Sequence, residues 1–132
     1  MKLIVCVDDR GGVMFNKRRQ SRDSVQRADM LAITADSRLL VTPYSAKLIS
    51  ADNVTVAPDP LAVAESGDYC FIEDVDPTPY ADSVDTVIKY LWNTAYPYDT
   101  CFDLDMSEYK LVSSVTFIGT SHKKITREIY KK

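Results

Sequence analysis

The sequence predicts an α/β fold of three layers, α-β-α, built on a mixed, mostly parallel sheet with a C-terminal antiparallel β-hairpin. Two patterns support this prediction. Wholly apolar runs at residues 2–7 (KLIVCV) and 69–72 (YCFI) are typical of strands that a sheet buries on both faces. Residues 110–118 and 124–130 instead alternate apolar and polar side chains, as strands with one exposed face do.

Helices and strands are expected to alternate between these two ends. In chain order the sequence predicts a helix at 22–33, a strand at 38–42, a short helix at 44–49, a strand at 53–57, a helix at 61–65, the strand at 69–72, a helical turn at 79–84 and a strand at 86–92. Ser21 or Asp23 can cap the first helix, in which Val25, Ala28 and Leu31 fall at helical spacing. Strands that alternate with helices imply right-handed crossovers and parallel pairing.

Proline and glycine set the limits of the shorter elements. Pro43 ends the second strand, because proline has no N–H to donate to a sheet. Pro60 suits the first turn of its helix, which Gly67 ends. Gly119 is expected to give the C-terminal hairpin its flexible turn position.

Length and composition favour a single domain over residues 1–132. The chain is 45% apolar and 27% charged, as globular proteins are, and it can bury a core without disulfides or a metal. It shows no secretion signal and no apolar run of about 18–20 residues, so we expect a cytoplasmic protein. Cys6, Cys70 and Cys101 are odd in number and widely spaced, which indicates free thiols.

The net charge of −3 conceals an uneven distribution. Residues 1–50 carry nine basic and five acidic side chains, residues 51–109 carry one basic and thirteen acidic, and residues 110–132 carry six basic and one acidic. Such asymmetry can mark a partner surface, or the acidic middle can complement the basic ends within one domain. We favour internal complementarity.

Both ends of the chain resemble dihydrofolate reductases. The opening LIVCVDDRGGVMFN is similar to that family's first strand and the mobile loop after it. Residues 99–102 (DTCF) match the family's Asp-Thr-x-Phe turn, residues 105–109 (DMSEY) match its Asp-x-x-x-Trp segment with Tyr in place of Trp, and residues 128–130 match its last strand. The middle of the chain resembles the family only in the order of its predicted helices and strands. The resemblance implies a dihydrofolate reductase-like fold and, as the family activity, NADPH-dependent reduction of a pteridine.

The motifs that bind the nicotinamide cofactor in that family are not matched here. Where the resemblance implies a Gly-Gly pair facing the pyrophosphate, this chain has Glu73, Asp74 and Asp76. Carboxylates at a helix N-terminus compete for the amides that would bind phosphate, and repel it. The family's Gly-Arg-x-Thr motif is replaced by residues 42–45 (TPYS), in which the arginine is missing and Pro43 removes an amide donor. NADPH is therefore disfavoured, and the cofactor stays unknown.

Asp23 is the nearest match to the carboxylate that holds the pterin in that family, and is the candidate catalytic residue. Its alternative role is a helix cap, which we favour. Ile4, Cys6, Asn16 and Trp92 are expected around a remnant ligand cleft between the first strand, the loop after it and the first helix. Trp92 stands where the family has a Thr, and an inward-pointing indole would fill the space of a pterin.

A basic cluster follows the first loop. Lys17, Arg18, Arg19 and Arg22 lie close together in the sequence and could bind phosphate, a nucleotide or RNA. No aromatic-rich platform for single strands accompanies them. The alternative is a solvated loop that pairs with the acidic middle of the chain, and we favour that alternative.

The opening also resembles a group of short bacterial proteins, some of which carry the label ribonuclease Z. A dinuclear zinc hydrolase needs a cluster of His and Asp ligands. This chain has a single histidine, His122, which we expect to be exposed in the hairpin turn, so no metal site is predicted. Residues 8–9, 73–76 and 103–105 are acidic, but none has the spacing of a known metal loop, and we interpret them as solvated turns.

Three functions stay open at this point. The first, which we favour, is a non-catalytic or repurposed dihydrofolate reductase-like domain that binds a small molecule or a partner, with a homodimer also compatible. The second is an NADPH-dependent reductase of a pteridine-like substrate with altered cofactor binding. The third is a phosphate- or RNA-binding protein that acts through the basic loop at 17–27. No contact with a membrane is expected.

Overall fold

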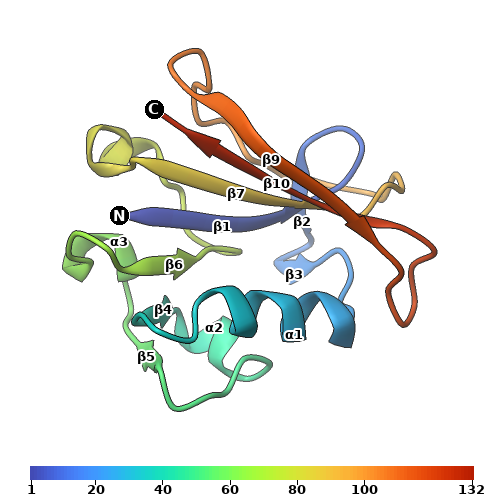
Figure 1. The fold of residues 1–132 in the computed structure, drawn as a ribbon. Helices are drawn as coiled ribbons and strands as arrows, with labels where there is room; N and C mark the ends of the chain where they lie inside the picture. Colours follow the sequence, from blue (N-terminus) through green and yellow to red (C-terminus); the bar gives the residue numbers. More distant parts are fainter.

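The computed structural model describes residues 1–132 and contains the predicted sheet (Figure 1). Its seven strands are, in chain order, β1 (Lys2–Val7), β4 (Leu39–Val41), β5 (Val54–Val56), β6 (Tyr69–Phe71), β7 (Thr86–Leu91), β9 (Lys110–Phe117) and β10 (Ile125–Lys131). Their order across the sheet is β5-β4-β6-β1-β7-β10-β9. The first five strands in this order, from β5 to β7, pair in parallel. The strand β10 pairs antiparallel with both of its neighbours, β7 and β9. The mixed sheet and its C-terminal hairpin are confirmed.

Helices connect the strands close to the positions expected from the sequence. They are α1 (Ser24–Ile33), α2 (Pro43–Ala46), α3 (Pro60–Val63) and a 3₁₀ helix at Thr78–Ser83. Pro43 and Pro60 stand at the start of α2 and α3, where the missing N–H costs no hydrogen bond. None of these helices is long and apolar enough to cross a membrane.

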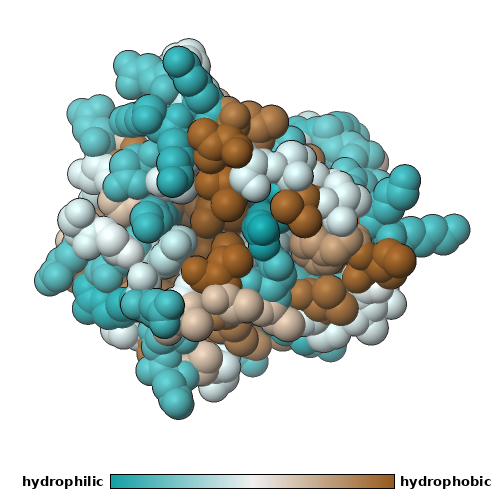
Figure 2. Space-filling model, viewed as in Figure 1, coloured by the Kyte–Doolittle hydropathy of each residue, from teal (hydrophilic) through white to brown (hydrophobic).

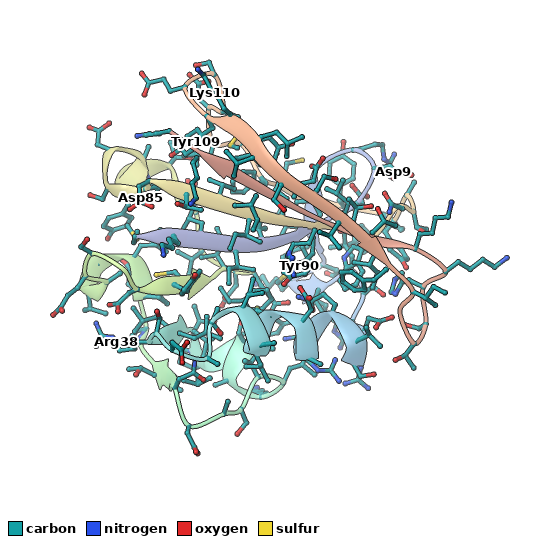
Figure 3. The ribbon with its side chains drawn as sticks, viewed as in Figure 1. Asp9, Arg38, Asp85, Tyr90, Tyr109 and Lys110 are labelled. Carbon is teal, nitrogen blue, oxygen red and sulfur yellow. The ribbon has the colours of Figure 1, made fainter.

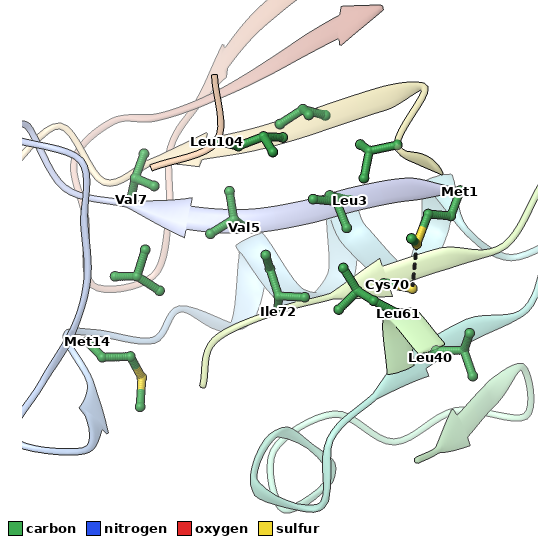
Figure 4. Close-up of a cluster of buried hydrophobic side chains, with 13 residues drawn as sticks. Met1, Leu3, Val5, Val7, Met14, Leu40, Leu61, Cys70, Ile72 and Leu104 are labelled. Carbon is green, nitrogen blue, oxygen red and sulfur yellow. Dashed lines mark hydrogen bonds between the residues drawn. The ribbon is translucent and has the colours of Figure 1, made fainter. Parts of the chain in front are cut away.

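The sheet separates two hydrophobic cores, because successive side chains of a strand point to opposite faces. Along β1, Leu3 and Val5 belong to one core and Ile4 to the other. The first core, drawn in Figure 4, includes Leu61 of α3. The second includes Met30 of α1. Helical elements therefore pack on both faces, which gives the three layers.

A polar contact also ties α1 to the sheet. Tyr90 of β7 points from the sheet toward α1 (Figure 3), and its buried hydroxyl donates to Asp29 across 2.6 Å. Arg127 of β10 donates to both carboxylate oxygens of Asp29, at 2.8 and 2.7 Å. These bonds connect the helix to two neighbouring strands and so fix its position.

A second, smaller sheet forms where the sequence predicted a loop after β1, and a short strand from the segment after β7 joins it. It consists of β2 (Gly12–Phe15), β3 (Arg18–Arg19) and β8 (Thr100–Cys101), in the order β3-β2-β8. Asn16 and Lys17 form the tight turn between β2 and β3, with φ of 51° and 62°. Two positive φ values in a two-residue turn match the twist of a hairpin. These strands are too short to give a periodic signal in the sequence.

The hairpin of β9 and β10 turns back toward the start of α1. Gly119 lies in this connection, but its role differs from the expected one, because its φ is not positive. A Cβ on Gly119 would lie 2.5 Å from Asp23 Oδ2 and 2.7 Å from Ile125 Cδ1. The glycine is therefore needed for close approach, not for backbone freedom.

The strand β9 is the edge of the large sheet and carries exposed apolar side chains. Leu111, Val112 and Val115 are each exposed, and Ile118 follows just beyond the strand. These side chains give the edge strand an exposed apolar surface. Figure 2 shows a band of apolar side chains down the middle of the same face, with mostly hydrophilic residues to its left and a mixed surface to its right.

Candidate functional site

Asp23 lies at the N-cap of α1 with its side chain completely buried. It accepts hydrogen bonds from the N–H groups of Val25 (2.9 Å), Thr120 (3.0 Å) and Ser121 (2.8 Å). His122 Nδ1 lies 3.0 Å from Asp23 Oδ2, and the Ser121 hydroxyl donates to the same oxygen at 3.2 Å. Burial alone would raise the pKa of Asp23, but these hydrogen bonds outweigh it and hold the pKa below its ordinary value. Asp23 is thus the helix cap that the sequence favoured.

His122 was expected to be exposed, and this expectation is wrong. The residue is only 8% exposed, because the β9–β10 connection folds back over the start of α1. Its ring stacks on Trp92, with centroids 4.5 Å apart and planes at 21°. Its Nε2 lies 3.1 Å from Ser21 Oγ and 2.9 Å from the Tyr96 hydroxyl. Nothing local to the hairpin sequence signals these contacts, since the partners lie far away in the chain.

Trp92 points inward and is 3% exposed. Its ring stacks on His122, and the cavity that it borders between β1 and the start of α1 measures only about 10 Å³. Cys6 and Trp92 border this cavity. The other two residues expected around a ligand cleft lie elsewhere: Ile4 is fully buried in the core, and Asn16 is exposed in the β2–β3 turn.

An open cavity of about 910 Å³ lies between β1, the segment after β6 and the strands β2 and β8 of the small sheet. Its apolar and aromatic wall is formed by Val5, Val13, Met14, Tyr44, Ile72 and Phe102. Its acidic residues are Glu73, Asp74, Asp76, Asp99 and Asp103. Lys17 is the single basic residue among those that line it. We call this cavity the acidic cleft.

Glu73 and Asp74 are held by hydroxyl groups from the start of α2. Ser45 Oγ donates to Glu73 (2.7 Å), and Thr42 Oγ1 donates to Asp74 (2.8 Å). Arg19 forms two hydrogen bonds with Glu73, at 2.8 and 3.0 Å, and its guanidinium lies over the ring of Tyr44. Glu73 is therefore a buried, paired carboxylate, and its interpretation as solvated turn charge was wrong.

Asp8 is also buried, at 4% exposed, although the sequence suggested a solvated turn. Its carboxylate accepts from the N–H groups of Arg10 (2.9 Å), Gly12 (2.7 Å) and Tyr96 (3.1 Å), and from the Gln20 amide. These bonds outweigh the effect of burial and lower the pKa of Asp8. Its role is to tie the loop after β1 to the segment after β7.

The four residues of the basic cluster do not share one surface role. Lys17, Arg18 and Arg22 are exposed, and Lys17 borders the acidic cleft. Arg19 instead turns inward to Glu73, so an external anion would have to displace an internal carboxylate. No group of three or more His, Cys, Asp or Glu side chains lies close enough together to hold a metal ion.

No protein-family model matches the sequence, and no curated protein matches it either. The structure is similar to dihydrofolate reductase from Enterococcus faecalis, solved as a complex with NADP(H) and RAB-propyl, with a TM-score of 0.66. The match covers 98% of this chain and 94% of that chain, at 13% sequence identity. A likeness at this identity concerns the fold. The sheet, its crossover helices and its C-terminal hairpin are those of a divergent dihydrofolate reductase-like fold.

Proposed function

We propose that this chain is a repurposed dihydrofolate reductase-like domain that binds a small cationic molecule in the acidic cleft and has lost pterin reduction. The observation that supports the proposal best is the contrast between two sites. The cavity between β1 and the start of α1, where the resemblance would put a pterin, measures about 10 Å³, whereas the acidic cleft offers about 910 Å³. A drug-sized ligand needs a cavity of roughly 300–1,000 Å³.

The hydrogen bonds of Asp23 support the loss of pterin binding. An ionised carboxylate offers about four lone-pair sites. In Asp23 they face the N–H groups of Val25, Thr120 and Ser121 and the Nδ1 of His122. A pterin would have to break these bonds and displace the stacked rings as well. Breaking the hydrogen bonds and separating the rings both cost free energy, and the new contacts of a partly solvated pterin would not restore it.

The negative charge of the acidic cleft supports weak binding of NADPH. Glu73, Asp74 and Asp76 line the cleft where the resemblance would put a pyrophosphate, and Pro43 provides no N–H at the start of α2. Each contact between like charges near a surface costs on the order of 1 kcal/mol or more. The hydroxyls of Thr42 and Ser45 already donate to two of these carboxylates.

The same lining favours a cation with an apolar body. Glu73 is paired with Arg19, but the other four carboxylates form no ion pair, and against one lysine they leave the cleft negative and attract an ammonium or amidinium group. The rings of Tyr44 and Phe102 and the aliphatic wall offer contact to an aromatic or aliphatic body. Charge and shape therefore agree on one class of ligand.

Calorimetric titration tests the proposal with 4-phenylbutylamine as the probe and 4-phenylbutanol as its uncharged counterpart. We expect the amine to bind and the alcohol to bind at least about tenfold more weakly, since an ammonium–carboxylate contact is worth on the order of 1.4 kcal/mol or more in a partly enclosed site. The double variant Asp74→Asn/Asp76→Asn should lose this preference. Asp36→Asn, at an exposed position outside the cleft, is the matched control. Equal binding of amine and alcohol would refute the proposal.

The two other functions are tested in the same series. Oxidation of NADPH that depends on dihydrofolate would establish a reductase and contradict the loss of pterin reduction. Binding of a short RNA at low salt, where a basic patch binds best, would support the loop at 17–27 as its site. The internal pairing of Arg19 with Glu73 argues against that site.

A further inference from the structure

Three side chains from two separate segments form a relay beside the start of α1. Ser21 Oγ lies 3.1 Å from His122 Nε2, and His122 Nδ1 lies 3.0 Å from Asp23 Oδ2. Ser21 and Asp23 precede α1, whereas His122 comes from the β9–β10 connection. A hydroxyl, an imidazole and a carboxylate in this order and at hydrogen-bond distances are the arrangement that activates a serine nucleophile.

The hydrogen bonds select the imidazole tautomer that such chemistry needs. An ionised carboxylate only accepts, so His122 Nδ1 carries the proton that is donated to Asp23. Nε2 is then unprotonated and can act as a general base. Its lone pair faces the hydroxyls of Ser21 at 3.1 Å and Tyr96 at 2.9 Å. Stacking on Trp92 holds the ring in this orientation.

Asp23 is suited to orient the imidazole. The N–H groups of Val25, Thr120 and Ser121 stabilise its ionised form. A buried, ionised carboxylate stabilises the imidazolium that forms when Nε2 takes a proton. Asp23 is therefore a positioning residue, and Ser21 and His122 are the groups that would touch a substrate.

Access to this relay is limited to the exposed part of Ser21. The side chains of His122 and Asp23 are almost fully buried, whereas Ser21 is half-buried and borders the cavity of about 10 Å³. A cavity of this size holds about one water molecule, so the carbonyl of an ester has to reach Ser21 from its solvent-exposed side, which favours a small acyl group. The backbone N–H of Arg22 donates to no backbone acceptor, so it is free to bind an oxyanion formed on the neighbouring Ser21.

We propose that Ser21 and His122, positioned by Asp23, hydrolyse esters of small carboxylic acids. Ser21 Oγ attacks the carbonyl carbon while His122 Nε2 takes the hydroxyl proton. The bond from this carbon to the alcohol oxygen then breaks, and the alcohol leaves with that proton. Water attacks the acyl-serine, again giving a proton to Nε2, which returns it to Ser21 as the carboxylic acid departs. The reaction needs no oxidant and does not depend on ligand binding in the acidic cleft.

Tyr96 supplies an internal check on this assignment. Its hydroxyl lies 2.9 Å from Nε2 of His122 and 3.4 Å from Ser21 Oγ, so it competes with the serine for the same lone pair. Tyr96→Phe removes the competitor and keeps the ring. We expect hydrolysis to become several-fold faster in this variant, and an unchanged or slower rate would count against Nε2 as the base.

The decisive experiment combines labelling with turnover. Methanesulfonyl fluoride, a small reagent that sulfonylates activated serines, should give a single adduct on the half-buried Ser21 in the folded protein, located by peptide mass spectrometry. The wild type should hydrolyse 4-nitrophenyl acetate, and Ser21→Ala should lose the adduct and about 10³-fold in kcat. Ser24→Ala is the matched control, because this nearby hydroxyl bonds only to Thr120 (2.6 Å) and should leave both readouts unchanged.

Two results would overturn the proposal. One is a folded protein in which Ser21 takes no label, and the other is a Ser21→Ala variant that hydrolyses the ester as fast as the wild type. The role of Asp23 is tested separately with Asp23→Asn, measured on protein that circular dichroism shows to be folded. We expect kcat to fall while KM stays the same, whereas an unchanged kcat would remove Asp23 from the assignment.

Discussion

The indole of Trp92 stacks on the imidazole of His122, with ring centroids 4.5 Å apart and planes 21° from parallel. The imidazole is also bonded to Asp23, and the cavity that Trp92 borders at the start of α1 measures only about 10 Å³. Trp92 is the first residue after β7, and His122 lies in the connection between β9 and β10. The closure of this site therefore depends on how the C-terminal hairpin packs against the body of the sheet.

Replacement of Trp92 by alanine should open this site and destabilise the protein. Loss of a buried indole costs about 3–5 kcal/mol, because the surrounding side chains collapse only in part. Unfolding in urea measures this loss, and Trp92→Phe, which keeps a stacked ring, should lose much less. The opened cavity should also bind free indole, which would raise the melting temperature of Trp92→Ala but not of the wild type. An alanine variant as stable as the wild type would mean that the stack fills no space.

Replacement of Gly119 by alanine tests the close approach of the hairpin to α1. The new Cβ would lie 2.5 Å from Asp23 Oδ2 and 2.7 Å from Ile125 Cδ1, so the connection must move and the bonds to Asp23 must weaken. We expect a loss of about 2–3 kcal/mol in unfolding free energy. Gly67→Ala is the comparison, because at φ +90° with open space around it the cost is backbone strain of about 1–2 kcal/mol. A smaller loss at Gly119 than at Gly67 would contradict the steric account.

The layers and the order of strands could be predicted because their signals are local. Apolar runs such as Lys2–Val7 mark buried strands. Alternation predicted the two strands of the C-terminal hairpin, although β9 has no buried face and its apolar side chains are exposed. From the missing N–H of proline, the sequence predicted that Pro43 ends a strand and that Pro60 lies in the first turn of a helix; the structure also begins α2 at Pro43. Each of these signals depends on the properties of a few neighbouring residues, so no knowledge of the tertiary structure is needed.

The polar interior could not be predicted in the same way. His122 and Asp23 are 99 positions apart, and Arg19 and Glu73 are 54 apart. Charge and polarity alone suggest exposure for such residues, and only the packed fold supplies their partners. The excess of acidic residues in the middle segment did indicate internal complementarity, and the Arg19–Glu73 pair is one instance of it.

The coupling between Arg19 and Glu73 can be measured with a double-mutant cycle. Arg19→Met should destabilise the fold because it leaves Glu73, 8% exposed, without its cation. Glu73→Gln alone should cost less, since Ser45 can still donate to the amide oxygen. Unfolding free energies of the two single variants and the double variant should give a coupling of about 1–3 kcal/mol. A coupling near zero would place the pair among weak surface contacts.

The three thiols should differ in their reactivity toward iodoacetamide. Burial raises the pKa of Cys6 well above its usual range, with nearby Glu73 adding to the effect, and it raises the pKa of Cys70 to about 12. Only thiolates react at a useful rate, so in the folded protein at pH 8 we expect alkylation of Cys101 alone. Mass spectrometry of peptides identifies the site, and all three should react in concentrated urea. Fast modification of Cys6 in the folded protein would show that its environment opens.

Acid should destabilise the protein partly through Asp23. Its hydrogen bonds hold the pKa below the unfolded value of about 3.9, so the native state binds the proton more weakly than the unfolded chain. The stability from these bonds is fully present above that value and is lost as pH falls toward the native pKa. Asp23→Asn has no charge to lose: at pH 7 it should be less stable than the wild type by about 1–3 kcal/mol. Between pH 5 and 2.5 its unfolding free energy in urea should fall less steeply than that of the wild type or of Asp36→Asn, an exposed control. Parallel curves for all three proteins would show that Asp23 does not contribute to the acid transition.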